Sequence, residues 1–518
     1  MAPEKASKAL SPLWAENKAR GRAILICALL SGVIAHGTGL FNKLSYHDDI
    51  LALFGVGTTL TSGRWMLHVM GVLEIMLFGD GHYSLPIMNG FFSILCVAGA
   101  AMLLADLLSI RRRGLCAALG GLMVVFPVMT AYFGFNYTMP YYMLAMLMMV
   151  AAGWLICRDL PWWAKLPAIV LGGCSVGTYQ AFLPMLLTII LLHDMRRLSE
   201  REESLPAFFR QVALQIVFVA GVMVFYAAAN RFFLNKFQME LSDYKGVNQV
   251  TSTSLSVYLQ RALDGYREFF IPARNVSYDM YPMHLHYVYL LMLGIDAALG
   301  VRLILKTWMS GLRAKAALLF LLLLLFPLGC NFIFVMCEGV HGLMTYGQVM
   351  QFALLIWLLD RVEIQAPRPR KMLSAAAAVM LGLTGVMYCR FDNQCYMRAT
   401  FEQQEAISFF STLITRIQST PDYHPDRPVA FLNAGEIESP SIYHMDELDF
   451  IELNPYGDNL TEYLNAYSWD LFMERWCGYY PQPYWGPELS DLPEVLAMPH
   501  YPEAGSIQVI NDVLVVKF

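Results

Sequence analysis

Two adjacent carboxylates and a guanidinium share the stretch SYHDDILALFGVGTTLTSGRW, residues 45–65. Asp48 and Asp49 follow the first long apolar run, and Arg64 comes sixteen residues after Asp48. An ion in hydrocarbon costs on the order of 3 kcal/mol at the bilayer centre, so ions at a membrane boundary are usually placed for a purpose. A carboxylate there can deprotonate an acceptor hydroxyl or hold a divalent cation such as Mg or Mn. A guanidinium can bind a phosphate through two parallel hydrogen bonds.

The same residues also fit a purely structural interpretation. HDDILALF has acids at the cap and in the first turn before apolar residues, which is typical of a helix start. Arg64 can reach lipid headgroups while its stem stays in apolar surroundings. If both acids are helical they point to different faces, so we expect different roles for them. We prefer Asp48 as the base, because Asp49 is the more natural first-turn residue.

Further polar side chains fall at span ends on the same side as the acids. They form three pairs, which are Asn136 with Tyr137, Tyr179 with Gln180, and His341 with Tyr346. Each pair alone is typical of an interfacial aromatic belt or a helix cap. Because all three share one side of the membrane, we expect them to line a single cavity that reaches the acids. No comparable set of polar residues interrupts the spans at mid-depth, which counts against a transporter.

Composition fixes the broad class. The chain has 518 residues, of which 57% are hydrophobic and 15% charged, whereas soluble domains average about 25% charged residues. We therefore expect a polytopic membrane protein. No CxxC, Cys/His metal cluster, Walker or Rossmann pattern occurs, and nothing indicates a nucleic-acid partner. The sequence leaves open one disulfide among Cys337, Cys389, Cys395 and Cys477.

Apolar runs predict about eleven spans. They cover 22–41, 84–110, 114–131, 139–157, 164–179, 180–194, 208–230, 284–304, 316–336, 344–360 and 372–389. Lys and Arg gather in the N-terminal tail and in the alternate turns that would share its side. The positive-inside rule therefore predicts a cytoplasmic N-terminus and a C-terminus outside.

The spans divide the chain into three predicted parts. Residues 1–21 are a cytoplasmic tail, 22–389 a transmembrane domain, and 390–518 a small outer α/β domain. The transmembrane domain has two longer outer loops, 42–83 and 231–283. Within the first, WMLHVMGVLEIMLF is too short to span and predicts an interfacial or re-entrant helix.

Residues 390–518 have sequence patterns that are typical of a soluble α/β domain. TFEQQEAISFFSTLITRIQ has helical spacing, RPVAFLNAG predicts a strand, and SIQVINDVLVVKF predicts a hairpin around Asn511 and Asp512. Its many tyrosines and tryptophans can stack on sugar rings or pack the domain. We therefore expect this part to help bind an acceptor.

The order of several motifs resembles the serotype-converting (Gtr-type) glucosyltransferase family of bacterial membranes. The matching pieces are DD after the first span, SGRW, VGTYQAFLP, HGLMTYGQ and the C-terminal SIQVINDVLVVKF. The resemblance implies a GT-C type helical transferase in the bacterial inner membrane, with its active site at the outer face. It also implies an inverting transfer from a polyprenyl-phosphate sugar, typically undecaprenyl-phosphate glucose, to a surface polysaccharide such as O-antigen or to a glycolipid.

The chemistry of such a transfer agrees with the residues. A phosphate leaving group is already stable as an anion, so the enzyme needs one base and positive charge near the phosphate. Asp48 or Asp49 is the predicted base or cation ligand, and Arg64 the predicted phosphate ligand. The alternative is a non-catalytic lipid-linked glycan transporter, or a component of a polysaccharide polymerase.

Overall fold

The computed structural model describes residues 2–44, 49–50, 60–79, 84–242, 254–271, 283–361, 368–433, 469–484 and 486–518. Asp48 lies outside these residues, as do large parts of the predicted loop 231–283 and of the C-terminal part. Asp49, Arg64 and the three predicted polar pairs are described.

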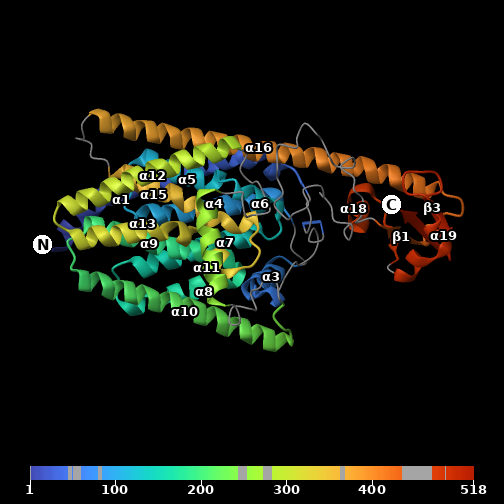
Figure 1. Ribbon diagram of the computed structural model, residues 1–518, viewed down its shortest axis with the longest axis horizontal. Coiled ribbons are helices and arrows are strands. Elements are labelled where there is room, and N and C mark those ends of the chain that lie inside the picture. The colour runs from blue at the N-terminus through green and yellow to red at the C-terminus, as the bar shows by residue number, and fades with distance from the viewer. Residues whose placement is uncertain are drawn as a thin grey trace.

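Long apolar helices lie side by side in one bundle (Figure 1). In the described part of the chain, eight helices are long and apolar enough to cross a membrane. They lie in α1 (Ala2–Phe41), α4 (Pro86–Leu107), α7 (Met139–Cys157), α10 (Leu205–Phe237), α12 (Met283–Met309), α13 (Arg313–Cys330), η5 with α15 (Gly342–Val349 and Met350–Asp360) and α16 (Arg368–Gln418). The protein is thus a multi-pass helical membrane protein, as the composition predicts.

The predicted span 114–131 is broken. It consists of α5 (Arg113–Val125) and α6 (Val128–Gly134), which meet at an angle of 48° and together make a ninth candidate span. Pro127 stands at the break, where its missing N–H and its ring disfavour a continuous helix.

The predicted spans 164–179 and 180–194 are α8 (Pro167–Thr178) and α9 (Leu183–Glu200). Neither passes the length and composition test for a span. α8 has only 12 residues, and the C-terminal part of α9 carries Asp194, Arg196, Arg197 and Glu200. The predicted count of eleven is therefore reached only if these two helices also cross the membrane.

Shorter helices connect the bundle. The predicted short apolar helix is α3 (Trp65–Phe78), preceded by the 3₁₀ turn η1 (Leu60–Ser62). The other short helices of the bundle are η2 (Trp162–Lys165), η3 (Gln180–Phe182), α11 (Leu255–Phe270) and α14 (Ile333–Met336).

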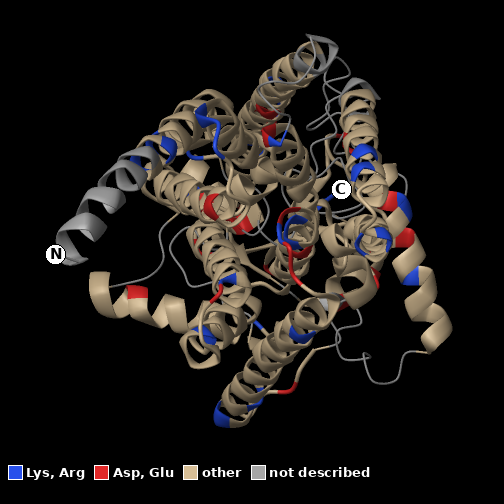
Figure 2. Cartoon of the chain, turned by 90° about the vertical axis from the view of Figure 1, so that its left-hand side faces the viewer, with Lys and Arg blue, Asp and Glu red and all other residues tan. Residues whose placement is uncertain are grey.

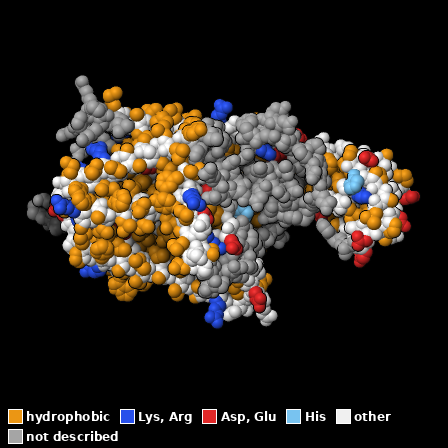
Figure 3. All heavy atoms as spheres, viewed as in Figure 1, with side chains coloured by type: hydrophobic (Ala, Val, Ile, Leu, Met, Phe, Trp, Pro, Cys, Tyr) orange, Lys and Arg blue, Asp and Glu red, His pale blue; other side chains and the backbone are white. Residues whose placement is uncertain are grey.

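The C-terminal part projects from the bundle on α16, a helix of 51 residues and therefore about 76 Å long (Figure 1). It contains the helices α18 (Trp469–Cys477), η9 (Pro487–Asp491) and α19 (Pro493–Leu496). Its strands β1 (Pro428–Leu432), β2 (Gln482–Pro483), β3 (Ile507–Ile510) and β4 (Val513–Lys517) form one sheet in the order β2-β1-β4-β3. Figure 3 shows hydrophobic side chains over much of the bundle and a more charged surface on this part. A membrane bundle with a small C-terminal α/β region is therefore confirmed.

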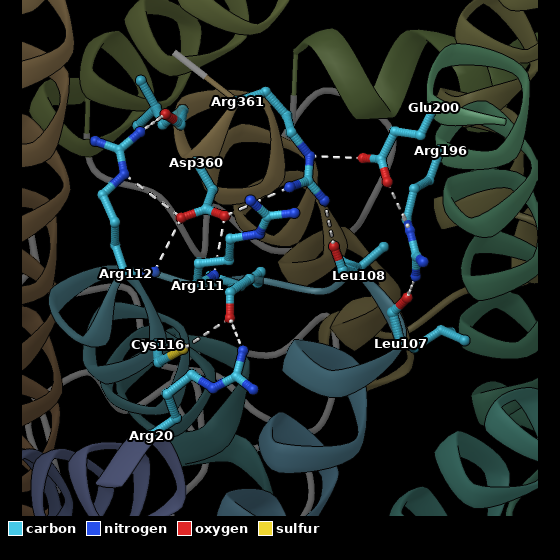
Figure 4. A network of polar contacts seen from close by, with 12 residues as sticks. Arg20, Leu107, Leu108, Arg111, Arg112, Cys116, Arg196, Glu200, Asp360 and Arg361 are labelled. Carbon is cyan, nitrogen blue, oxygen red and sulfur yellow. Dashed lines mark hydrogen bonds and ion pairs between the residues drawn. The ribbon is translucent and has the colours of Figure 1, made fainter. Parts of the chain in front are cut away.

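The two ends of the bundle differ in charge. One end, here called the basic end, carries Arg20, Arg112, Arg196 and Arg361, and Figure 2 shows Lys and Arg at several helix ends on this side. Asp360 accepts hydrogen bonds there from the backbone N–H groups of Arg111 and Arg112, at 2.9 and 3.0 Å, and so holds the chain just before α5 (Figure 4). The other end, here called the loop end, carries Asp49, Arg64 and the turn between α6 and α7.

Candidate active site

A buried carboxylate fixes the chain that follows α1. The side chain of Asp49 is fully buried. Its oxygens accept hydrogen bonds from Ser84 Oγ at 3.0 and 3.1 Å and from the backbone N–H of Tyr137 at 3.2 Å. Lys43 forms an ion pair with the same carboxylate. One carboxylate therefore joins the chain after α1, the start of α4 and the turn between α6 and α7.

Asn136 completes this polar group. Ser84 Oγ lies 3.2 Å from Asn136 Oδ1. Asn89 Nδ2 donates to the backbone carbonyl of Asn136 at 2.9 Å and to its Oδ1 at 3.2 Å. The α6–α7 turn is thus held by α4, and it presents the N–H of Tyr137 to Asp49.

Burial sets the electrostatics of the Asp49–Lys43 pair. Desolvation raises the pKa of the Asp49 carboxyl, and the Lys43 ammonium and the hydrogen bonds from Tyr137 and Ser84 oppose that rise in part. Desolvation also lowers the pKa of Lys43, which the Asp49 carboxylate opposes. Each charge offsets part of the desolvation cost of the other, so removing one partner leaves the second group buried without that compensation.

Arg64 is held between two tyrosines. Its Nη1 donates to Tyr142 Oη at 3.3 Å, and its guanidinium carbon lies 5.3 Å from the centre of the Tyr179 ring. The two tyrosine rings stack with their centres 4.7 Å apart. Cation–π contact and a hydrogen bond together restrict the guanidinium to one place at the loop end.

A cavity of about 850 Å³ opens beside Arg64. Apolar side chains from several helices line much of it, among them Val176, Leu183, Leu187, Val219, Met223, Phe332 and Met336. Polar side chains also line it, and the two cations Arg64 and Arg231 outnumber the one acid among its described lining residues, Glu240. The uncharged polar residues include Tyr179, Gln180, Tyr226, Asn230 and Asn235. Such a site suits a ligand with an apolar chain and an anionic head.

A tight turn shapes one wall of this cavity. Gly63 has a positive φ of 76°, which lets η1 turn directly into Arg64 and α3. Gln180 Nε2 donates to the backbone carbonyl of Ser62 at 2.9 Å and lies 3.3 Å from Tyr226 Oη. The turn that carries Arg64 is thus tied to η3 and α10.

The turn between α6 and α7 and the first turn of α7 connect Asp49 with Arg64. The N–H of Tyr137 bonds to Asp49, and the hydroxyl of Tyr142 accepts from Arg64. Tyr137 and Tyr142 are only five positions apart in the chain, so the two contacts belong to one short segment. The carboxylate and the cavity are therefore neighbouring parts of one site.

A sequence profile of a known family matches this part of the chain. The profile described as glucosyl transferase GtrII covers residues 37–358, more than half of the protein. The chain belongs to this family. The matched range contains Asp49, Arg64 and every residue that lines the cavity. The family is described as glucosyl transferases, and this member of it is a multi-pass membrane protein.

A solved structure is also similar to this GtrII-family chain. It is the oligosaccharyltransferase of Archaeoglobus fulgidus, solved in complex with Zn and sulfate, with 12% sequence identity and a TM-score of 0.38. The match covers 89% of this chain and 62% of that one, so this chain spans less than two thirds of its length. A similarity this low says nothing about mechanism, and the GT-C type of the bundle stays a prediction. No curated protein sequence matches significantly.

The structure separates the six predicted cavity residues into two groups and a remainder. Tyr179 and Gln180 line the cavity with Arg64, whereas Asn136 and Tyr137 surround Asp49. Tyr346 and His341 are not in the cavity lining. The Tyr346 hydroxyl donates to the carbonyl of Met123 at 2.5 Å in the bundle core, and His341 precedes η5 as its cap residue. Instead of one cavity lined by all six, the site has a polar group and an adjoining cavity.

Several site residues are not predicted from the sequence. Lys43 stands out there only as one of two cations in the first outer loop. Asn230 is the last residue of the predicted span 208–230, and Arg231 and Asn235 lie where α10 continues past it. A polar stretch within an otherwise apolar helix is the signal that could have identified them.

The predicted cation site at Asp48 and Asp49 stays a prediction. Within the described ranges, no group of three or more His, Cys, Asp or Glu side chains could hold a metal ion. Asp48 lies outside those ranges. All ten cysteines are free, including the four for which the sequence leaves a disulfide open.

Proposed function

We propose that this GtrII-family protein is a membrane glycosyltransferase that moves glucose from a polyprenyl-phosphate donor to a hydroxyl of a surface glycan or glycolipid. The donor of this proposal is undecaprenyl-phosphate glucose, and the acceptor is a bacterial surface polysaccharide such as O-antigen. The reaction takes place at the outer face of the bacterial inner membrane, with the N-terminus in the cytoplasm and the C-terminus outside.

The cavity beside Arg64 carries this proposal. Its apolar walls suit the first isoprene units of a lipid, and Arg64 and Arg231 supply positive charge for a phosphate. Tyr226, Gln180 and Asn230 add hydrogen-bonding groups of the kind that a phosphate or a sugar hydroxyl requires. A lipid-linked donor also agrees with an outer site, because nucleotide sugars are not available outside the cytoplasm.

In the proposed reaction, the acceptor oxygen attacks the anomeric carbon while a carboxylate takes the hydroxyl proton. The bond between the anomeric carbon and the phosphate oxygen breaks, and its electron pair leaves on polyprenyl phosphate. Attack from the face opposite the leaving group inverts the anomeric centre. Arg64 stabilises the charge that increases on the departing phosphate.

The two acids receive different roles in this proposal. Lys43, Ser84 and the N–H of Tyr137 occupy the carboxylate of Asp49, which leaves it poorly placed to reach a substrate. We therefore assign Asp49 to positioning the loop and Asp48 to proton abstraction. The second proposed role of the pair, binding of Mg or Mn, predicts that a chelator stops the reaction.

Release of lipid phosphate tests the proposal directly. Purified protein is given undecaprenyl-phosphate glucose and the acceptor glycan, and undecaprenyl phosphate and glucosylated acceptor are quantified by mass spectrometry. We expect both products in equal amounts, and an anomeric configuration opposite to that of the donor. A transporter or polymerase component would bind the donor and release no lipid phosphate, which would refute the proposal.

A further inference from the structure

A second cavity lies at the basic end, between α9, α12 and α15. Its volume is about 220 Å³. It is lined by Ser199, Glu200, Leu299, Arg302, Leu303, Lys306, Trp357, Leu358 and Arg361. None of these residues belongs to the site around Asp49 and Arg64.

The charges in this cavity are unbalanced. Among the described residues that line it, Glu200 is the single acid, and both of its carboxylate oxygens already bind guanidinium groups (Figure 4). Arg361 Nε lies 2.6 Å from Oε1, and Arg196 Nε lies 3.2 Å from Oε2. Glu200 therefore does not neutralise Arg302, which has no hydrogen bond or ion pair with any part of the chain described here. Arg302 therefore brings into the cavity a positive charge that no described side chain neutralises.

The same cavity borders the lipid-facing surface of the bundle. Val301 and Leu305 are exposed, at 51% and 55% of their surface, as expected for side chains that face acyl chains. Arg302 and Lys306 follow them directly and lie one helical turn apart, so the cations stand beside this apolar stripe. A ligand that filled the cavity could extend an apolar tail along α12.

We propose that this cavity binds the headgroup of an anionic phospholipid of the phosphatidylglycerol type. Arg302 would contact the phosphate, with Lys306 one helical turn away in the same lining, and the acyl chains would lie along Val301 and Leu305. Basic pockets between helices at a membrane surface attract anionic headgroups in this way. The positive-inside rule assigns this end to the cytoplasmic leaflet. The proposal is independent of the donor, whose cavity lies at the loop end.

The size of the cavity favours this ligand over a peptide. Its volume equals roughly seven water molecules at ~30 Å³ each, which is room for a phosphate with part of a glycerol. Free inorganic phosphate would use the same cations but not the apolar stripe. The test must therefore separate these two sources of phosphate.

Lipid retention in native mass spectrometry tests the proposal. The full-length protein is purified in detergent and mixed with equal amounts of phosphatidylglycerol and phosphatidylcholine. We expect the parent to retain phosphatidylglycerol preferentially, and the double variant Arg302→Ala with Lys306→Ala to retain about 30-fold less of it. The matched control is Arg113→Ala with Arg210→Ala, which removes the same charge from exposed positions outside the cavity, and we expect it to behave as the parent.

Two measurements on the parent protein test the proposal even if the double variant does not fold. Phosphatidylglycerol should raise the thermal midpoint more than phosphatidylcholine does, and high salt should remove that difference. The proposal is overturned if the parent shows no preference, or if the Arg302/Lys306 variant retains phosphatidylglycerol as the parent does. It is also overturned if inorganic phosphate stabilises the protein as much as the lipid, because the ligand would then be the free ion.

Discussion

Asp49 and its neighbour Asp48 illustrate how one pair of adjacent acids can divide two tasks. Asp49 is buried in contact with Lys43 and Ser84. Replacing Asp49 by Asn removes one charge of that pair, so we expect a loss of about 2 to 3 kcal/mol of stability together with reduced activity. Replacing Asp48 by Asn should leave the thermal midpoint unchanged and lower turnover by about 100-fold to 10,000-fold.

Turnover and the thermal midpoint of the two single variants distinguish these roles, and each variant serves as the control for the other. If the double variant Asp48→Asn with Asp49→Asn glucosylates at the parental rate while expressed normally, the acids are only a helix start.

Arg64 allows a second test at the residue scale. Arg64→Lys keeps the charge but loses the planar group that stacks on Tyr179 and donates to Tyr142. We expect the KM for the lipid donor to rise about tenfold, with the KM for the acceptor unchanged. Steady-state kinetics with each substrate varied in turn measure both constants, and Arg210→Lys at an exposed position is the control. Equal effects on donor and acceptor would contradict a role in phosphate binding.

At the scale of elements, the turn before α3 determines where Arg64 lies. A Cβ at Gly63 would lie 2.5 Å from Tyr226 Oη and 3.0 Å from Gln180 Nε2, so Gly63→Ala must displace both side chains. We expect weaker donor binding from this variant. Gly79→Ala is its matched control, because φ is also positive there, at 95°, and nothing lies within 4 Å of the added Cβ. Both variants should lose about 1 to 3 kcal/mol to backbone strain, and only Gly63→Ala should raise the donor KM. Similar donor KM values for the two would show that the cavity wall tolerates the displacement.

The C-terminal part reaches back to the site through single side chains. Arg475 of α18 donates to the backbone carbonyl of Ile50, and Gln403 of α16 donates to that of Lys43 at 3.2 Å. Both contacts hold the chain on either side of the acids. We expect Arg475→Ala to lower kcat severalfold without changing the KM for the donor, whose cavity it does not line. Arg427→Ala is the control, since Arg427 binds Asp512 within the C-terminal sheet region. A loss of activity that is equal in both variants would point to unfolding of the region instead.

Local elements are predictable from the sequence because their signals are local. The hairpin pairs Ile510 with Val513 around Asn511 and Asp512. These two turn residues have positive φ values of 49° and 62°, a conformation that Asn and Asp tolerate better than most residues. The predicted hairpin is therefore confirmed at its predicted turn.

Contacts between distant segments are not predictable in the same way. The hydrogen bond from Arg475 to Ile50 joins residues 425 positions apart, and no periodicity encodes it. The span pattern assigns Asn136 and Tyr179 to one side of the membrane. Which of them lies beside Asp49 and which lines the cavity depends on how the helices pack, because each helix can present several faces to its neighbours.

At the scale of the whole molecule, α16 connects the helical bundle with the C-terminal part. It contains a candidate membrane span and continues past the loop end to the C-terminal sheet (Figure 1). Part of α16 packs against α1 within the bundle, and its last turns pack on α18 through Phe410 and Trp469, at 5.1 Å between ring centres. A single continuous helix therefore sets the position of the C-terminal part relative to the acids.

This arrangement makes the sidedness of the protein testable with one pair of introduced cysteines. Ala504→Cys lies at an exposed position of the C-terminal part, and Arg113→Cys lies at an exposed position of the basic end. If the N-terminus is cytoplasmic, the odd number of crossings predicted here brings the C-terminal part outside. A membrane-impermeant maleimide added to intact spheroplasts should then label Ala504→Cys, and should label Arg113→Cys only after lysis.

The parent chain measures the background from its ten native cysteines. Labelling of Arg113→Cys in intact spheroplasts would reverse the topology, and it would place Asp49 and Arg64 on the cytoplasmic side, where a nucleotide-sugar donor becomes available and the argument for a lipid-linked donor fails.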